Sequence, residues 1–531
     1  MITSKDDASR PRLTVVMIVR DEQETLAASV ESVRAIADEI LVVDLGSTDR
    51  TTELALELGV MVNNYGWEND YSAPRNHSLR QADGDWIMWL DAGERLNEES
   101  AESLRDFIDH DAQEQYVYRI VVQTPPDERS QAEQIAQIRL VPNNPDLRFE
   151  GRVRETLQPS VDAIGLSVDN APGLILCHAR RFDPDWRASQ AELDLQLAAL
   201  EIADSDEPQA RVLLATGEAQ AELGKQLQAM EGFCKAIEAT QRGSTEMLEG
   251  YYGLLTSCDG DLQQQDRQLD ICLEALEIFP LDAQLLLAMG NYLQIRDRWD
   301  LAIRSFRTAV KHGQVDIGTW HLVELGEVAV ACLSLCLQAK GSDSDALRTL
   351  AEGIERYGHS PRLLRHQLDL QVRHARCDDA LATAGKLVPD SKQREALSLA
   401  IRGACKAAQK DWTAALGLLQ SAYVEGCRDS LCLRWLSVVL LSNGQTEAAM
   451  PVLLEWQQIE PNNAELRTYL EELQRPPPTP TDGATRERPP EEDASGRVYR
   501  VDEAIDGAPP ATSATPNAVQ DSSKDSLSTG E

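Results

Sequence analysis

Four short polar clusters within the first hundred residues carry side chains that could bind a nucleotide. A carboxylate at the end of a strand can accept hydrogen bonds from a base or a ribose, and a planar guanidinium such as that of Arg75 suits phosphate oxygens. An acidic cluster can hold a divalent metal ion against a diphosphate. Any one of these residues alone is more often a helix cap, a turn residue or a surface charge, so only their order and spacing together indicate a binding site. The clusters are Arg20-Asp21-Glu22, Asp44-Leu45-Gly46-Ser47-Thr48-Asp49, Ala73-Pro74-Arg75-Asn76 and Asp91-Ala92-Gly93-Glu94.

The elements that would position these clusters are short apolar strands that alternate with helices. Residues 22–37 have the three-and-four apolar spacing of an amphipathic helix, and residues 51–58 predict a second one. Strands buried on both faces and alternating with helices predict an α/β domain with a doubly wound, mostly parallel sheet. Ligands bind such sheets at the carboxyl ends of the strands, where the four clusters fall. The predicted strands are residues 13–19, 40–43, 60–62, 86–90, 116–122, 135–141 and 174–177.

Beyond residue 194 the strand signals stop, and Ala, Leu and Gln follow a repeating helical pattern. Equivalent positions are separated by 39, 34, 44, 34, 35 and 34 residues, and a small residue often lies twelve positions before each of them. A period near 34 with small residues where two helices pack closely resembles the tetratricopeptide repeat. We therefore expect an all-α solenoid of helix pairs that folds without the first domain, because each repeat contacts only its neighbours. The equivalent positions are Ala229, Gln268, Ala302, Ala346, Ala380, Ala415 and Ala449.

Composition and charge exclude several classes of function. The 531 residues include 88 acidic and 51 basic ones, for a formal net charge of −37, which repels nucleic acids and anionic lipid surfaces. No run of about eighteen apolar residues predicts a membrane span, and the ten cysteines are scattered without metal-site spacing. We expect a cytoplasmic protein with reduced thiols, no nucleic-acid partner and no integral membrane segment.

The motifs of the first domain resemble those of family 2 glycosyltransferases with the GT-A fold, a Rossmann-like mixed sheet. The resemblance covers residues 13–180 and is closest to a soluble bacterial branch that includes lipopolysaccharide-core and peptide-glycosylating enzymes. A later stretch, residues 148–155, and His178 also match that branch. The two segments that carry the resemblance are VVMIVRDEQETLAASVESVRAIADEILVVDLGSTDRT and YSAPRNHSLRQADGDWIMWLDAGERL.

The resemblance implies roles for individual residues in an inverting, hexosyltransferase-like transfer from a nucleotide-sugar. Glu22 and Asp44 would contact the base or ribose of the donor, and Asp49 would steady the turn or contact the nucleotide. Arg75 would lie near the base or diphosphate, and Asp91 would bind Mn²⁺ or Mg²⁺ together with the donor. The base that takes the acceptor proton would be Glu155, with Glu150 as the second choice.

Two departures from the family pattern concern the metal. Gly93 stands where the family has the second acid of its Asp-x-Asp motif, and Arg154 stands where it has histidine. We expect either that Arg154, with Arg152, grips the diphosphate in place of the metal, or that Glu94 replaces the missing acid and keeps the metal bound.

These observations predict a glycosyltransferase domain at residues 13–190 and a tetratricopeptide-like solenoid at residues 194–475. A flexible segment at residues 1–12 and a disordered acidic tail at residues 476–531 would flank them. The solenoid would recruit a glycan, lipid or peptide acceptor or a protein partner, or mediate self-association. The alternative is a degenerate transferase domain that keeps nucleotide binding within a repeat scaffold. A nucleotidyltransferase is disfavoured because no Gly-rich phosphate loop lies near the N-terminus.

Overall fold

The computed structural model describes residues 10–126, 132–177, 183–205, 207–258, 262–461 and 463–474. The predicted tail at residues 476–531, most of the predicted segment at residues 1–12, and His178 lie outside the described residues. The described chain divides into two compact units. The first runs to Tyr292 and takes in His312–Leu325, and the second comprises Leu293–Lys311 and the helices from Gly326 onward.

A mixed sheet forms the centre of the first domain, as predicted. Its strands follow the order β3-β2-β1-β4-β7-β6-β8-β5, with β9 paired to β7. Neighbours from β3 to β4 are parallel, whereas β4–β7 and β6–β7 are antiparallel. The strands in the described residues are β1 (Leu13–Val19), β2 (Glu39–Asp44), β3 (Met61–Asn64), β4 (Trp86–Trp89), β5 (Arg95–Leu96), β6 (Tyr116–Gln123), β7 (Glu133–Pro142), β8 (Ser167–Leu176) and β9 (His321–Leu322).

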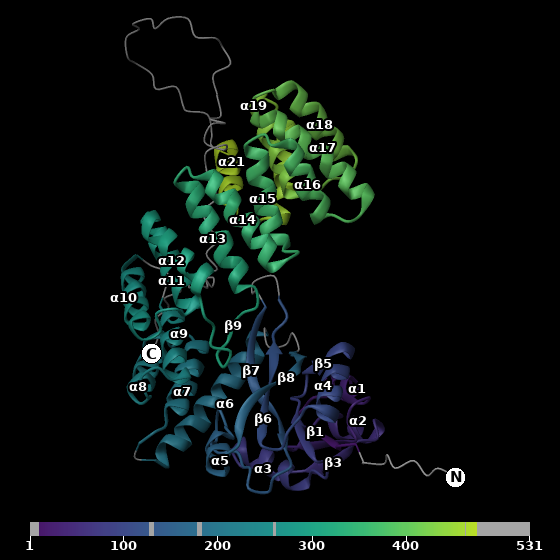
Figure 1. Ribbon diagram of the computed structural model, residues 1–531, viewed down its shortest axis with the longest axis vertical. Helices are drawn as coiled ribbons and strands as arrows, with labels where there is room; N and C mark the ends of the chain where they lie inside the picture. The colour runs from purple at the N-terminus through teal and green to yellow at the C-terminus, as the bar shows by residue number, and fades with distance from the viewer. Residues whose placement is uncertain are drawn as a thin grey trace, which may run out of the picture. The chain divides into compact units, whose positions relative to one another are not determined.

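The sheet is buried on both faces because successive side chains of its central strands are apolar. Val15 and Met17 of β1 pack in one apolar cluster, while Val16 packs in a second cluster with Trp89 of β4. Side chains alternate across a strand, so a continuous apolar run supplies both faces at once. The helices of this domain are α1 (Leu26–Val33), α2 (Thr51–Glu57), α3 (Ser72–Gln81), α4 (Glu98–His110) and α5 (Gln158–Ile164) (Figure 1).

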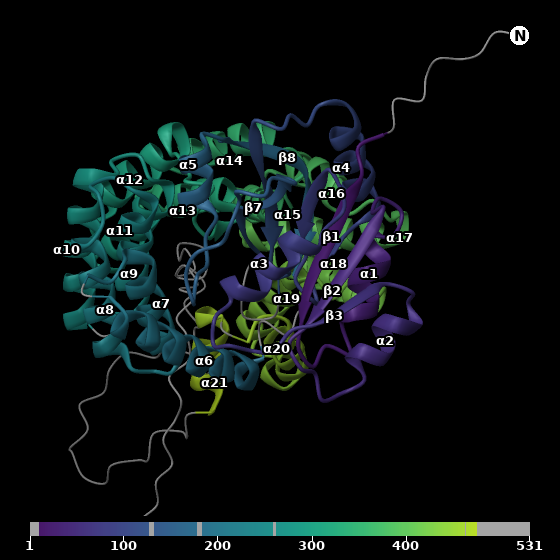
Figure 2. The same ribbon diagram turned by 90° about the horizontal axis from the view of Figure 1, so that it is seen from below.

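After the sheet the described chain is almost entirely helical, as the repeat pattern predicts, and α7 to α10 stack side by side (Figure 2). No helix among the described residues combines the length and the apolar character needed to cross a bilayer. The helices are α6 (Pro184–Ala203), α7 (Ala210–Glu222), α8 (Gln226–Glu238), α9 (Thr245–Thr256), α10 (Leu262–Ile278), α11 (Ala283–Ile295), α12 (Trp299–His312), α13 (Leu325–Ala339), α14 (Asp343–Tyr357), α15 (Pro361–Arg373), α16 (Cys377–Leu387), α17 (Ser391–Ala408), α18 (Trp412–Val424), α19 (Ser430–Ser442), α20 (Thr446–Ile459) and α21 (Ala464–Gln474).

The repeat positions lie in the second helix of each pair, and small residues allow the paired helices to approach. Ala229 of α8 and Ala415 of α18 are fully buried. A Cβ atom at Gly217 of α7 would come within 2.7 Å of the Phe233 ring of α8. At Gly403 of α17 a Cβ atom would come within 2.7 Å of a side-chain carbon of α18. The small residues are therefore required by the close packing of each helix pair.

Candidate functional site

The carboxyl ends of β1, β2 and β4 meet along one edge of the sheet. β1 pairs in parallel with both neighbours, so Val19 at its end lies opposite Asp44 of β2. Asp91 follows the end of β4 by two residues. The sheet therefore brings the clusters that follow these three strands to one side, as the sequence predicts for a doubly wound sheet.

Asp44 closes the turn that follows its own strand. Its carboxylate accepts hydrogen bonds from the backbone N–H groups of Gly46 and Ser47, each at 3.1 Å, and the residue is only 4% exposed. Gly46 has a φ of +90°, which favours glycine. These contacts give Asp44 a structural role in the loop. Its contact with a donor nucleotide stays a prediction.

The loops after β1 and β2 are tied together by carboxylates that reach from one to the other. Asp21 accepts a hydrogen bond from the Thr48 N–H at 2.7 Å, and this bond lowers the pKa of Asp21 below its usual value. Asp49 in turn accepts one from the Gln23 N–H at 3.1 Å. Glu22 is buried, and its backbone N–H donates to Oγ1 of Thr51 at 2.7 Å. The structure thus places Glu22, Asp44 and Asp49 together in one pair of interlocked loops.

Arg75 on α3 lies between two of the predicted site acids. Its Nε is 2.5 Å from Oε1 of Glu155, and its Nη2 is 3.3 Å from Oδ1 of Asp91. The side chains of Arg75 and Glu155 are only 17% and 14% exposed. Burial alone would lower the pKa of Arg75, but the two carboxylates outweigh it and raise that pKa. Three predicted residues, far apart in sequence, therefore form one ion-paired group.

Arg139 on β7 completes this group, and sequence reasoning missed it. Its Nη1 is 3.3 Å from Oδ2 of Asp91, and its Nη2 is 2.9 Å from Oε1 of Glu94. Burial would raise the pKa of Asp91, but Arg139 and Arg75 together lower it to about 2. The alternating strand around Arg139 gives no motif that could have identified it. Asp91 is thus held ionised between two guanidinium groups.

The acids predicted to bind Mn²⁺ or Mg²⁺ already have partners on each carboxylate oxygen. Asp91 faces Arg75 and Arg139, while Glu94 faces Arg139 and accepts a hydrogen bond from the Asp91 N–H at 2.9 Å. Within the described ranges, no group of three or more His, Cys, Asp or Glu side chains could hold a metal ion. This donor set does not fit an ion held by the protein alone. Binding of a cation together with the donor's own phosphates stays a prediction.

Residues 150–156, which we call the strap, carry both candidate bases. Reciprocal backbone hydrogen bonds of 2.9 and 3.0 Å between Glu150 and Thr156 close the strap into a loop. Next to it, Asn76 of α3 brackets the backbone of Phe149, donating to its carbonyl at 2.9 Å and accepting from its N–H at 2.7 Å. Helix α3, which carries Arg75, therefore also holds the backbone of the residue that precedes the strap.

The two candidate bases have different surroundings. Glu155 points to Arg75 and is largely buried, whereas Glu150 pairs with Arg148 at 2.9 Å and its side chain is 39% exposed. Only Glu155 joins the group around Asp91. The geometry therefore favours Glu155 over Glu150 as the base, and that role stays a prediction.

The arginines predicted to bind diphosphate point instead to helices of the repeat region. Arg152 pairs with Asp204 at 2.9 Å, while Arg154 pairs with Glu249 at 2.7 Å and with Glu218 at 3.4 Å. A role for either arginine at the diphosphate would require these ion pairs to open. That role stays a prediction, and Arg75 and Arg139 are the guanidinium groups that contact Asp91.

The first domain matches the model of a known family. Residues 14–165 match the model of the glycosyl transferase family 2. They form a family 2 glycosyltransferase domain. A TPR repeat-containing protein of Synechococcus elongatus is 36% identical over 160 residues, which cover 30% of this chain and 38% of the relative. An uncharacterized glycosyltransferase of Rickettsia typhi is 29% identical over 110 residues, covering 20% of this chain and 37% of the relative.

The chain thus spans less than two fifths of the length of these relatives. Among solved structures, a tetratricopeptide repeat protein from Parabacteroides merdae is 12% identical with a TM-score of 0.37, covering 50% of this chain and 99% of that one. A likeness at this score carries no argument about function. The chain therefore combines a family 2 transferase domain, shown by the family match, with tetratricopeptide-like helix pairs, shown by the packing of the repeat helices.

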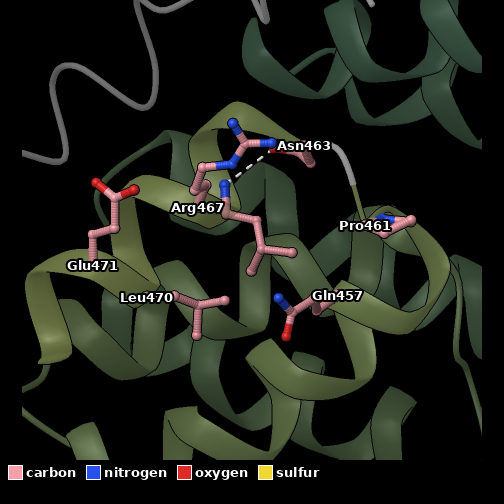
Figure 3. A pocket seen from close by; sticks show the side chains of 7 residues that line it. Gln457, Pro461, Asn463, Arg467, Leu470 and Glu471 are labelled. Atoms are coloured by element: carbon pink, nitrogen blue, oxygen red, sulfur yellow. Dashed lines mark hydrogen bonds between the residues drawn. The ribbon is translucent and has the colours of Figure 1, made fainter. Parts of the chain in front are cut away.

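A separate hollow lies between α20 and α21 in the second unit (Figure 3). Its lining includes Gln457, Arg467, Leu470 and Glu471, and none of the predicted site residues. The hollow is not part of the candidate site.

Proposed function

We propose that this chain is a glycosyltransferase that moves a sugar from a nucleotide-activated donor, such as a UDP-sugar, to a glycan, lipid or peptide acceptor with inversion. The observation that carries the proposal is the buried guanidinium of Arg75, which joins Asp91 and Glu155 at the ligand-binding edge of a family 2 domain. This group combines a phosphate-binding cation with a candidate base.

The donor would lie across the ends of β1, β2 and β4. Its base and ribose would contact the interlocked loops that contain Glu22, Asp44 and Asp49, and its diphosphate would approach Arg75 and Arg139. Each of these two guanidinium groups pairs with the carboxylate of Asp91. The donor phosphates, which are also anions, would bind the same two guanidinium groups. Desolvated guanidinium groups stabilise the charge that develops as a diphosphate leaves.

Glu155 would act as the base in the transfer step. Its carboxylate takes the proton of the acceptor hydroxyl while that oxygen bonds to the anomeric carbon from the face opposite the diphosphate. The bond from the anomeric carbon to the diphosphate breaks, and its electron pair leaves with the nucleoside diphosphate. The ion pair with Arg75 holds Glu155 in orientation during this step.

The repeat helices would recruit the acceptor or a protein partner, or mediate self-association. The net charge of −37 favours neutral or basic partners over nucleic acids. One observation favours the alternative of a degenerate domain that binds nucleotide within a scaffold. Gly93 replaces a motif acid, and both oxygens of Asp91 are taken by arginines.

A thermal-shift panel of UDP-glucose, UDP-N-acetylglucosamine and GDP-mannose, each with and without Mn²⁺, tests the proposal. A donor at a hundred times its dissociation constant stabilises the native state by about 2.7 kcal/mol. Arg75→Lys keeps the positive charge but loses the planar guanidinium that contacts both Asp91 and Glu155. This variant should therefore show no increase in melting temperature with the donor. Glu99→Gln, an exposed residue of α4, is the matched control and should keep it. Binding without release of nucleoside diphosphate would favour the scaffold, and no shift with any donor would refute the proposal.

A further inference from the structure

Helices of the repeat region contact the strap through residues other than Glu155. Arg154, near the tip of the strap, pairs with Glu249 of α9 at 2.7 Å and with Glu218 of α7 at 3.4 Å. The Glu249 side chain is only 14% exposed, so this ion pair is largely shielded from water. A shielded ion pair with a short charge-assisted hydrogen bond restrains both partners more than a surface pair does.

The backbone of the strap is also held by α6 and α7. Glu201 of α6 accepts a hydrogen bond from the Arg152 N–H at 2.7 Å, and Arg211 of α7 donates one to the Val153 carbonyl at 2.7 Å. Arg211 and Glu201 are themselves ion-paired. Gly151 has a φ of +105°, and a Cβ atom there would overlap the Arg211 guanidinium. The positive φ favours glycine at this position, and glycine also leaves room for the Arg211 guanidinium.

Apolar packing adds to these polar contacts. Val153 is 3% exposed and belongs to one buried cluster with Leu197 and Ala198 of α6 and Val212 and Ala215 of α7. The tip of the strap is therefore part of the core that joins the transferase domain to the first repeat helices. Burial of Val153 in this shared core restrains the loop in addition to its own backbone hydrogen bonds.

The strap needs this external support because its conformation is strained at the decisive residue. Arg154 has a φ of +48°, a left-handed conformation that a residue with a side chain rarely adopts. In this conformation Arg154 reaches α7 and α9, while the next residue, Glu155, reaches Arg75. Such strain persists only where surrounding contacts hold it.

We propose that Arg154 is a positioning residue through which Glu249 and Glu218 of the repeat helices hold the strap so that Glu155 faces Arg75. The repeat region is then a part of the catalytic apparatus and more than a recruiting module. The catalytic consequence rests on the proposed function, whereas the dependence of the strap on Glu249 does not.

The test compares Glu249→Gln and Arg154→Gln with the wild type in the full-length chain. The matched control is Glu222→Gln, which removes an ion pair between α7 and Arg187 of α6 that does not touch the strap. Hydrogen exchange of the amides of residues 150–156 is measured first, without ligand. We expect exchange in the strap to become at least tenfold faster in both test variants and to stay within twofold in the control.

The second measurement is release of UDP from UDP-glucose, or from whichever donor of the panel the wild type turns over. We expect kcat to fall at least tenfold in Glu249→Gln and Arg154→Gln while KM stays within threefold, because donor contacts remain and only Glu155 loses its orientation. Arg154→Lys keeps the charge and should recover part of kcat. A merely structural role would lower the melting temperature without separating kcat from KM.

The outcomes separate this inference from the proposed function. Strap exchange and kcat like those of Glu222→Gln would overturn the inference. A wild type that turns over no donor would refute the proposed function, and strap exchange would then decide by itself whether the repeat helices hold the strap. Faster exchange with a selective loss of kcat would support both.

Discussion

Asp194 on α6 provides a stability prediction that follows from its burial beside other acids. Its Oδ1 accepts a hydrogen bond from Nε2 of Gln190 at 2.9 Å. Burial raises the pKa of Asp194 from 3.8 to about 6; the Gln190 hydrogen bond opposes this effect, and the charges of Glu155 and Glu218 add to it. At neutral pH the folded chain therefore carries a carboxylate that its surroundings disfavour.

The sign and size of the effect follow from proton linkage. Well below its ordinary pKa of 3.8, Asp194 is protonated in both the folded and the unfolded state and costs nothing. Between about pH 4 and pH 6 the unfolded state releases its proton first, so the free energy of unfolding falls by about 1.4 kcal/mol for each pH unit. Above pH 6 the total cost is about 3 kcal/mol. Asp194→Asn removes this cost, so it should stabilise the protein by about 2 to 3 kcal/mol at pH 7.5 but by only about 0.5 kcal/mol at pH 4.

Urea unfolding of the full-length chain at pH 4, 5, 6 and 7.5, followed by circular dichroism, measures this difference. The control is Glu192→Gln, an exposed acid of the same helix, which should change stability by less than about 0.5 kcal/mol throughout. A gain for Asp194→Asn that is equal at all four pH values would show that a cause other than titration is at work. A loss at pH 7.5 would refute the reasoning.

Two further predictions concern the site. Arg139→Gln removes the guanidinium that pairs with buried Glu94 at 2.9 Å, so urea unfolding at pH 7 should show a loss of about 3 kcal/mol, and a loss below about 1 kcal/mol would contradict the ion-pair network. Asp44→Ala should abolish UDP binding by calorimetry under conditions where the wild type binds, while far-ultraviolet circular dichroism stays unchanged. Unchanged affinity would place the nucleotide elsewhere.

The sequence by itself determined the two kinds of architecture. Apolar runs such as residues 13–19 and 86–90 appear as β1 and β4, because a strand buried on both faces needs little beyond its own composition. Small residues such as Gly217 predicted helix pairs because close helix packing requires them wherever it occurs. The short strands β5 and β9 were missed, since two residues carry no periodicity. The first half of β8 was missed because many of its side chains are exposed.

Which charged side chains pair with each other depends on the packing of distant elements. The polar clusters after β1, β2 and β4 were recognisable because parallel strands bring their carboxyl ends to one edge. Arg139 pairs with an aspartate 48 residues away, and Arg154 with a glutamate 95 residues away. Local patterns report whether a side chain is buried, whereas the partner of a buried charge depends on how distant elements pack. The same packing pairs Arg154 with the repeat helices and leaves Glu155 beside Arg75.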